Sequence, residues 1–222
     1  GAFSAVLNGL DAGTTYYFRA KADGDGDAVY GLESTFTTSS LPPSVTTDMP
    51  GDITSTSARL NGNLTSLGTA ENATVSFEWG LTEAYGSETP TEVKAGEGTY
   101  YFDLTPLTGK TTYHFRAKAV SDDGTAYGND RYFTTLTVPP SVATDDASDI
   151  AVDGARLNGI LGSVGTAENV TVSFEWGLIS GGPYPLPTGA QTLSEPREFF
   201  VDLNGVLAYN TTFYYRAKAD GD

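Results

Sequence analysis

The residue types that carry most enzymatic chemistry are scarce in this chain. His114 is the only histidine and there is no cysteine, so a metal site would have to rely on oxygen ligands. His114 alternates with aromatic residues in a strand-like stretch, which indicates a surface position rather than a general base or a metal ligand. No nucleophile elbow, phosphate-binding loop or His-Glu-x-x-His motif occurs, and no pair of carboxylates is marked by spacing as acid and base. We therefore predict no catalytic residues and no enzyme activity in this segment.

Acidic residues gather in two places where calcium is the chemistry to consider. An EF-hand loop that began at Asp23 would need a bidentate glutamate at its twelfth position, which is Ser34, so that motif is excluded. A hairpin turn and a solvated acidic loop are the interpretations we favour, and weak calcium binding is the alternative left open. The calcium candidates are Asp23, Asp25, Asp27, Asp145, Asp146 and Asp149. No other cofactor is expected.

Four Asn-x-Ser/Thr sequons mark candidate glycosylation sites, provided that the producing cell has the machinery. They are Asn63, Asn72, Asn169 and Asn210. Asn72 and Asn169 end two copies of the segment Gly-Thr-Ala-Glu-Asn, so we expect them in the same loop of successive repeats.

The elements that would position these side chains are repeated along the chain. The stretch Tyr113–Ala119 alternates apolar with charged or polar residues, as a strand with one buried face does, and it recurs at residues 16–22 and 213–219. Copies about 100 residues apart indicate tandem domains of ordinary size. We predict that residues 1–40 are the C-terminal part of a domain, with strands at 3–7, 16–22 and 29–38. Residues 41–135 form a complete domain, and residues 136–222 form a domain that lacks its last strand. Paired prolines at 42–43 and 139–140 favour an extended, stiff linker.

Large aromatic residues on the apolar side of these strands are assigned to the cores. They are Tyr16, Trp79, Tyr113, Trp176 and Phe213. Trp79 is expected to be buried with Phe77, Tyr113 and Phe115, because large aromatic side chains dominate core packing. On the opposite side, Glu78 and Arg116 are expected to form an ion pair between neighbouring strands.

Four motifs carry a resemblance to a known family. In the middle copy they are Phe77–Gly80, the corner Leu107-x-x-x-Thr111-x-Tyr113, the Arg116-Ala117-x-Ala119 strand, and Tyr127-Gly128 followed by Phe133-Thr134-Thr135. The chain resembles the fibronectin type III superfamily, in the form found in large bacterial and archaeal surface proteins. The resemblance implies an all-β fold of tandem immunoglobulin-like antiparallel β-sandwiches. It implies little about function, since such modules serve as spacers, adhesins and enzyme appendages.

The third copy departs from the pattern at its corner and in one loop. Phe213 replaces the corner tyrosine and removes its hydroxyl, and the corner is one residue longer, with Tyr209 as a candidate substitute. The loop Gly181–Pro187 differs from its counterpart in the middle copy. A variable loop on a fixed sandwich is where a ligand would bind, and a drifting surface loop is the interpretation we favour.

Charge and composition limit the partners. The net charge is −16, and such a surface repels nucleic acid and anionic membranes. No apolar run is long enough to insert into a membrane. We predict a structural spacer of an extracellular or cell-surface repeat protein, as a stalk, fibre or filament segment. The alternatives are an adhesin or carbohydrate-binding module and a non-catalytic appendage of an extracellular hydrolase. Expected partners are neighbouring repeats of the same chain or adjoining subunits, with cell-surface glycans as the alternative.

The first and third copies agree where the middle one differs, which indicates alternating repeat types. Lys21–Asp25 matches Lys218–Asp222, whereas the middle copy reads Lys118-Ala119-Val120-Ser121-Asp122. We therefore expect the native chain to continue past Asp222 with a strand like 29–38 and to extend upstream of Gly1. An open edge beside residues 213–219 would otherwise be exposed to unwanted strand pairing.

Overall fold

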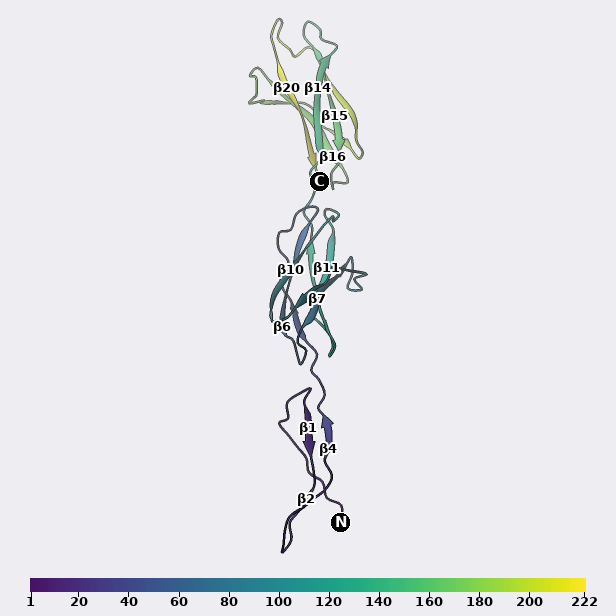
Figure 1. The fold of residues 1–222 in the computed structure, drawn as a ribbon. Coiled ribbons are helices and arrows are strands. Elements are labelled where there is room, and N and C mark those ends of the chain that lie inside the picture. The colour runs from purple at the N-terminus through teal and green to yellow at the C-terminus, as the bar shows by residue number, and fades with distance from the viewer. The chain divides into compact units, whose positions relative to one another are not determined.

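The computed structural model of the chain describes residues 1–222, and every regular element in it is a β-strand. The predicted all-β class is therefore confirmed. The chain divides into two compact units, one made of Gly1–Leu107 with Thr112–Thr134 and the other of Thr108–Thr111 with Thr135–Asp222. Figure 1 shows the strands of each unit along the chain.

The first 40 residues form two small antiparallel ladders. β1 (Thr15–Phe18) pairs with β4 (Ser34–Thr37), and β2 (Lys21–Ala22) pairs with β3 (Val29–Tyr30). The strand expected at 3–7 is absent, because no neighbouring strand bonds to its backbone; Phe3 and Val6 are 77% and 85% exposed. The single strands expected at 16–22 and at 29–38 are each two short strands. Gly31 leaves the ladder between β3 and β4 and donates its N–H to the carbonyl of Ala20 at 2.9 Å.

The middle repeat is a sandwich of two antiparallel sheets. The first sheet has the order β10-β6-β5, from Gly98–Leu104, Ala58–Ser66 and Ser44–Thr47. The second has the order β12-β11-β7-β8, from Gly124–Tyr127, Thr112–Ser121, Ala73–Gly80 and Ser87–Glu88; β13 (Arg131–Thr134) also pairs with β11, and β9 (Glu92–Lys94) with β7. A three-stranded sheet facing a second sheet of this order is the sandwich that the sequence predicts.

Alternation along the strands builds the core of this repeat. Leu60 and Leu64 on β6 face Phe77 on β7 and Phe115 on β11, and all four side chains are at most 1% exposed. The intervening residues of β6 and β11 lie at the surface, as expected for strands that are buried on one face. No residue of 1–40 belongs to this core or to that of the third repeat.

The third repeat has the same plan with its own core. One sheet has the order β14-β15-β19, from Ser141–Ser148, Ala155–Ser163 and Arg197–Leu203. The other is built on β16 (Val170–Gly177), which pairs with β17 (Leu186–Pro187), β18 (Gln191–Leu193) and β20 (Tyr214–Gly221). Leu161, Val172 and Phe174 are completely buried between the sheets.

One threonine joins the two sheets of the sandwich in the middle and third repeats. Thr47 on β5 is 5% exposed, and its Oγ1 accepts a hydrogen bond of 2.9 Å from the N–H of Ala117 on β11. β11 pairs with β13 before this point and with β12 after it, so the Ala117 N–H falls between the two short strands. Thr144 and Ala217 form the same bond in the third repeat, at 2.8 Å.

Candidate functional site

On the outer face of the second sheet, the middle and third repeats each carry an arginine that is held by a carboxylate and by an aromatic ring. Arg116 donates from Nε and Nη2 to Glu78 Oε2 at 2.9 and 2.7 Å, which confirms the predicted pair between β11 and β7. Its guanidinium lies 3.9 Å from the ring centre of Tyr127 and 4.8 Å from that of Tyr85. These contacts fix the arginine in one geometry, which an isolated surface ion pair does not achieve.

The third repeat builds its cluster with a residue of the variable loop. Arg216 bonds to Glu175 at 2.7 Å, and the ring of Tyr184 covers its guanidinium at 5.3 Å. The aromatic side chain of the Gly181–Pro187 loop is therefore half-buried against the arginine. One face of this ring packs on Arg216, and the adhesin alternative stays a prediction.

The outer face of the first sheet carries the same arrangement of arginine, carboxylate and aromatic ring. Arg59 donates two hydrogen bonds to the Asp103 carboxylate, at 2.7 and 2.9 Å, and lies 4.3 Å from the ring centre of Tyr101. Arg156 does the same with Asp202 and Phe200. The hydrogen bonds from the guanidinium lower the pKa of the Asp103 and Asp202 carboxyl groups below their usual range.

Lys118 links the cluster around Arg116 to β8, because its ammonium lies 3.4 Å from Glu78 Oε1 and 2.8 Å from Glu88 Oε2. Glu88 on β8 accepts hydrogen bonds from Lys118 Nζ at 2.8 Å and from Ser76 Oγ at 2.6 Å. The bond from Lys118 is the main cause that lowers the pKa of Glu88 from its usual 4.5, and Ser76 acts in the same direction. Because the folded state depresses this pKa, the pair stabilises the repeat above about pH 4.5, and this contribution is lost as the pH falls through the lowered value.

Replacing the lysine should reverse that shift. In Lys118→Met the ammonium donor is gone, so we expect the Glu88 carboxyl to titrate at a higher pH than in the parent chain. Carbon-13 NMR of the side-chain carboxyl through an acid titration measures this directly. Ser76→Ala should move the midpoint in the same direction by less. An unchanged midpoint in Lys118→Met would show that the ion pair is not formed in solution.

A cluster that the sequence did not reveal surrounds His114. Its Nδ1 lies 2.9 Å from Asp130 Oδ2, and the hydroxyl of Tyr85 donates to Asp130 Oδ1 at 3.0 Å. Glu83 completes the group: its carboxylate, a ring nitrogen of His114 and a carboxylate oxygen of Asp130 all lie within 4.8 Å of one another. Burial and the bond to Asp130 raise the pKa of Tyr85 to about 12, so this hydroxyl stays a donor at neutral pH. These residues come from separate loops and strands, so no spacing rule on one sequence identifies them.

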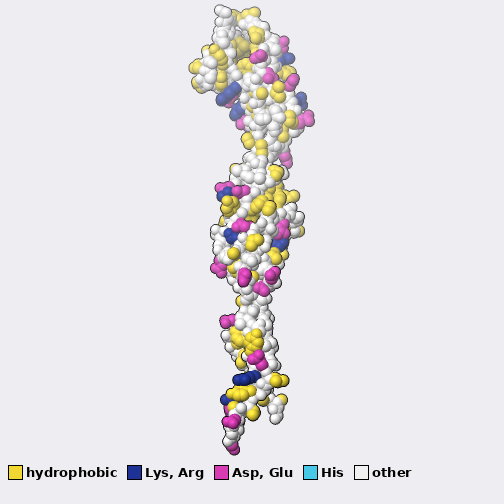
Figure 2. Space-filling model, in the orientation of Figure 1, with side chains coloured by type: hydrophobic (Ala, Val, Ile, Leu, Met, Phe, Trp, Pro, Cys, Tyr) yellow, Lys and Arg dark blue, Asp and Glu magenta, His cyan; other side chains and the backbone are white.

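The calcium candidates do not converge in the structure. Asp23 pairs with Lys21 at 3.0 Å and Asp149 with Arg156 at 3.5 Å, and all six candidates are exposed. No three of them bring carboxylate oxygens as close together as the group around His114 does. The expectation of an acidic loop is wrong for Asp145 and Asp146, which lie on β14, and calcium binding at any of the six stays a prediction. Figure 2 shows other Asp and Glu side chains, in magenta, scattered over the visible surface in the same way.

The sequons lie at the surface, and three of their four asparagines are exposed. Asn72 and Asn169 stand immediately before β7 and β16 in matching loops, and Asn210 lies in a turn with a φ of 52°. Asn63 is part of β6 and is half-buried. A glycan at the three exposed positions would meet no core residue, and glycosylation itself stays a prediction.

The five aromatic residues assigned to the cores differ in how deeply they are buried. Tyr113 is 6% exposed, whereas Trp79 is only partly buried and packs against the core with its ring centre 6.0 Å from that of Tyr113. Trp176 and Phe213 pack edge to face at 5.5 Å, and Tyr16 stacks on Phe36 at 5.8 Å. Trp79 and Trp176 are both close to the ends of their strands, where less of the opposite sheet covers them.

The corner of the third repeat is not repaired by Tyr209. In the first repeat the Tyr16 hydroxyl accepts a hydrogen bond from the N–H of Asp11 at 2.8 Å, the bond that Phe213 cannot form. The suggestion that Tyr209 substitutes is wrong, because its side chain is 71% exposed. Tyr209 precedes Asn210, which has a φ of 52°, as Gly109 precedes Lys110 with a φ of 53°, so Tyr209 occupies the position of Gly109 in a matching turn.

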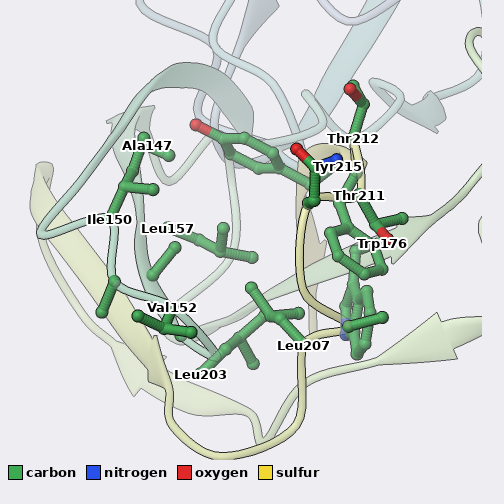
Figure 3. Close-up of a pocket in the computed structure, with 16 residues that line it drawn as sticks. Ala147, Ile150, Val152, Leu157, Trp176, Leu203, Leu207, Thr211, Thr212 and Tyr215 are labelled. Carbon is green, nitrogen blue, oxygen red and sulfur yellow. The ribbon is translucent and has the colours of Figure 1, made fainter.

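An apolar cleft of about 380 Å³ opens at this end of the third repeat. Figure 3 shows Ile150, Val152, Leu203 and Leu207 on one side of it and Trp176 on the other. In the middle repeat Phe133 of β13 covers the corresponding strand, stacked on Tyr113 at 5.7 Å. Residues 136–222 contain no counterpart of Phe133. The cleft is thus explained by strand content and does not identify a ligand site.

The repeated segment Gly-Thr-Ala-Glu-Asn binds the linker that leads into the middle and third repeats. Thr69 donates its N–H to the carbonyl of Leu41 at 3.1 Å, and its Oγ1 accepts from the Leu41 N–H at 3.0 Å. Gly68 has a φ of +69°, and a Cβ there would clash with that same carbonyl oxygen. Only glycine fits a left-handed conformation with so close an approach of another chain segment. We call this arrangement the linker clasp.

The third repeat forms its own linker clasp with the same chemistry. Thr166 donates to the carbonyl of Val138 at 2.9 Å and accepts from its N–H at 3.1 Å. Gly165 has a φ of +64° and approaches Val138 as Gly68 approaches Leu41. Two backbone-directed hydrogen bonds on the residue before a proline pair hold each linker against its own domain. The sequence reveals that this segment recurs, but it does not reveal that the segment binds the linker.

Comparisons with known proteins find structural likeness and no sequence family. Neither a protein-family model nor a curated protein matches the sequence. A segment of two fibronectin type III domains from chicken tenascin is similar with a TM-score of 0.42 and 14% identity, covering 81% of this chain and 91% of that one. The sensor domain of the anti-sigma factor RsgI4 in Pseudobacteroides cellulosolvens is similar with a TM-score of 0.37 and 18% identity, covering 43% and 95%. The structure has no helix long and apolar enough to cross a membrane.

Proposed function

We propose that the chain is a spacer segment of an extracellular or cell-surface repeat protein, in which successive β-sandwiches are joined by linkers of restricted flexibility. In this proposal residues 1–40, 41–135 and 136–222 belong to three repeats of one kind. The repeats contact their neighbours in the same chain or in an adjoining subunit.

The linker clasp carries the proposal. A freely jointed chain of domains would not need a glycine and a threonine that hold the start of each linker, yet the middle and third repeats both place this pair against the residue that precedes two prolines. Proline pairs restrict the linker further, since their φ is fixed and they favour an extended backbone. The acidic surface, with a net charge of −16, suits a long soluble segment that repels its copies.

Distance measurements between spin labels on the middle and third repeats test the proposal. The chain has no cysteine, so Glu97→Cys and Glu195→Cys, both at exposed positions, provide two unique labelling sites. A spacer with restricted joints should give a narrow distribution of distances between the two labels in pulsed electron paramagnetic resonance. A parent distribution as broad as that of a flexible chain would refute the spacer function.

Opening the clasp of the third repeat should broaden that distribution. Gly165→Ala introduces a Cβ that clashes with the Val138 carbonyl, and Thr166→Val removes the oxygen that accepts the Val138 N–H. Gly189→Ala is the matched control, because a Cβ there meets nothing within 4 Å. Thermal melting of each variant separates a released linker from an unfolded repeat. If Gly165→Ala and Thr166→Val leave the distribution as narrow as the control does, the clasp does not stiffen the joint.

A further inference from the structure

The cluster around His114 has the donor set of a transition-metal site. Glu83 follows β7, His114 lies on β11, and Asp130 lies between β12 and β13, so three separate segments converge. One imidazole nitrogen and two carboxylate oxygens match the ligands that Zn²⁺ takes at about 2.0–2.2 Å. Calcium prefers six to eight oxygen ligands, and an imidazole in the set favours zinc, copper or nickel over calcium and magnesium.

We propose that Glu83, His114 and Asp130 bind one Zn²⁺ ion on the surface of the middle repeat. The separation of His114 Nδ1 and Asp130 Oδ2 is 2.9 Å. Two ligands of a tetrahedral zinc lie about 3.3 Å apart, so the pair needs only a small adjustment. Zn²⁺ takes the place of the proton between Nδ1 and the carboxylate. The imidazole binds in its neutral form through Nδ1 and carries its one N–H on Nε2, the two carboxylates each donate a lone pair, and water fills the fourth position.

Neighbouring groups orient the ligands for this role. The Tyr85 hydroxyl donates to the second oxygen of Asp130, which leaves Oδ2 directed at His114. Tyr132 packs beside the imidazole, with ring centres 5.8 Å apart. Such outer hydrogen bonds and packing contacts hold metal ligands in a productive orientation. A bound ion would tie the Thr82–Gly86 loop, through Glu83, to β11 and to the loop before β13.

The other repeats supply the natural control. Tyr17 and Tyr214 occupy the position of His114 in the first and third repeats, and Ser180 occupies that of Glu83 in the third. The fold therefore accepts tyrosine at this position, and the proposed site belongs to the middle repeat alone. His114→Tyr removes the imidazole donor without introducing a residue foreign to the sandwich.

Titration of the full 222-residue chain with zinc chloride near neutral pH tests the site. Calorimetry should show one Zn²⁺ per chain. His114→Tyr and Glu83→Gln should weaken binding about ten-fold or more. Glu97→Gln, which removes an exposed carboxylate elsewhere, should bind as the parent does. Because His114 is the only histidine, its ring protons give one unambiguous set of NMR signals, which zinc should shift and calcium should not.

Two results would overturn the proposal. One is the absence of both binding heat and a change in the His114 signals at saturating zinc. The other is equal affinity in the parent and in His114→Tyr, which would assign the heat to scattered surface carboxylates. Melting curves without zinc show whether each variant is folded, so a loss of binding cannot be mistaken for loss of the repeat.

Discussion

Phe115→Ala should lower the free energy of unfolding of the middle repeat by about 3–5 kcal/mol. Phe115 is completely buried, and its ring lies 6.2 Å from that of Phe77 and 6.1 Å from that of Phe133. It therefore joins three strands of the second sheet at the centre of the core. Domains of this size have about 5–15 kcal/mol of stability, so the variant would be marginal or unfolded at room temperature.

The two tryptophans make this measurement specific to one repeat. In a Trp176→Phe background, Trp79 is the only tryptophan, and it reports on the middle repeat through its contact with Tyr113. Denaturant titration followed by its fluorescence gives the midpoint for each variant. Val93→Ala on β9 is the control, since Val93 is 67% exposed and should change stability by about 0.5 kcal/mol at most. A Phe115→Ala midpoint equal to that of Val93→Ala would refute the packing of the two sheets described above.

Alternation of apolar and polar residues was enough to predict the strands and one of their registers. The period of two on β6, β7 and β11 is visible in the sequence, and Glu78 with Arg116 follows from placing those strands side by side. The same pattern failed at residues 3–7, because a strand needs a hydrogen-bonded neighbour as well as a pattern. It also overstated the burial of Trp79, since the period gives the face of a strand but not how far the opposite sheet extends.

The two sites on which the proposals rest could not be predicted from one sequence. The group of Glu83, His114 and Asp130 depends on where two loops meet a strand, and His114 by its position alone indicated only a surface residue. The linker clasp left a clear signal, because Gly-Thr recurs after the second strand of the middle and third repeats. A glycine at matching positions predicts a left-handed or close-packed backbone, but not which segment approaches it.

The hydrogen bond of Thr47 also could not be predicted from the sequence, because its partner lies where the pairing between strands is interrupted. Thr46 and Thr47 are neighbours of the same type on β5, yet only Thr47 points inward. The N–H of Ala117 lies where β11 changes from β13 to β12, so no strand accepts its hydrogen bond, and Thr47 Oγ1 does so instead. A buried N–H without a partner destabilises the folded state by more than one intact hydrogen bond stabilises it. The reason is that the N–H has already lost its hydrogen bond to water.

Thr47→Val should therefore destabilise the middle repeat by about 1–3 kcal/mol, although the side chain keeps its size. Thr46→Val on the exposed face is the matched control and should stay within about 0.5 kcal/mol of the parent. Thr47→Ser keeps the hydroxyl, so most of the stability should return. Trp79 fluorescence in the Trp176→Phe background measures all three variants, and hydrogen exchange of the Ala117 amide follows the bond itself. If Thr47→Val proves as stable as Thr46→Val and the Ala117 amide remains protected, another group satisfies that N–H, and Thr47 does not join the two sheets.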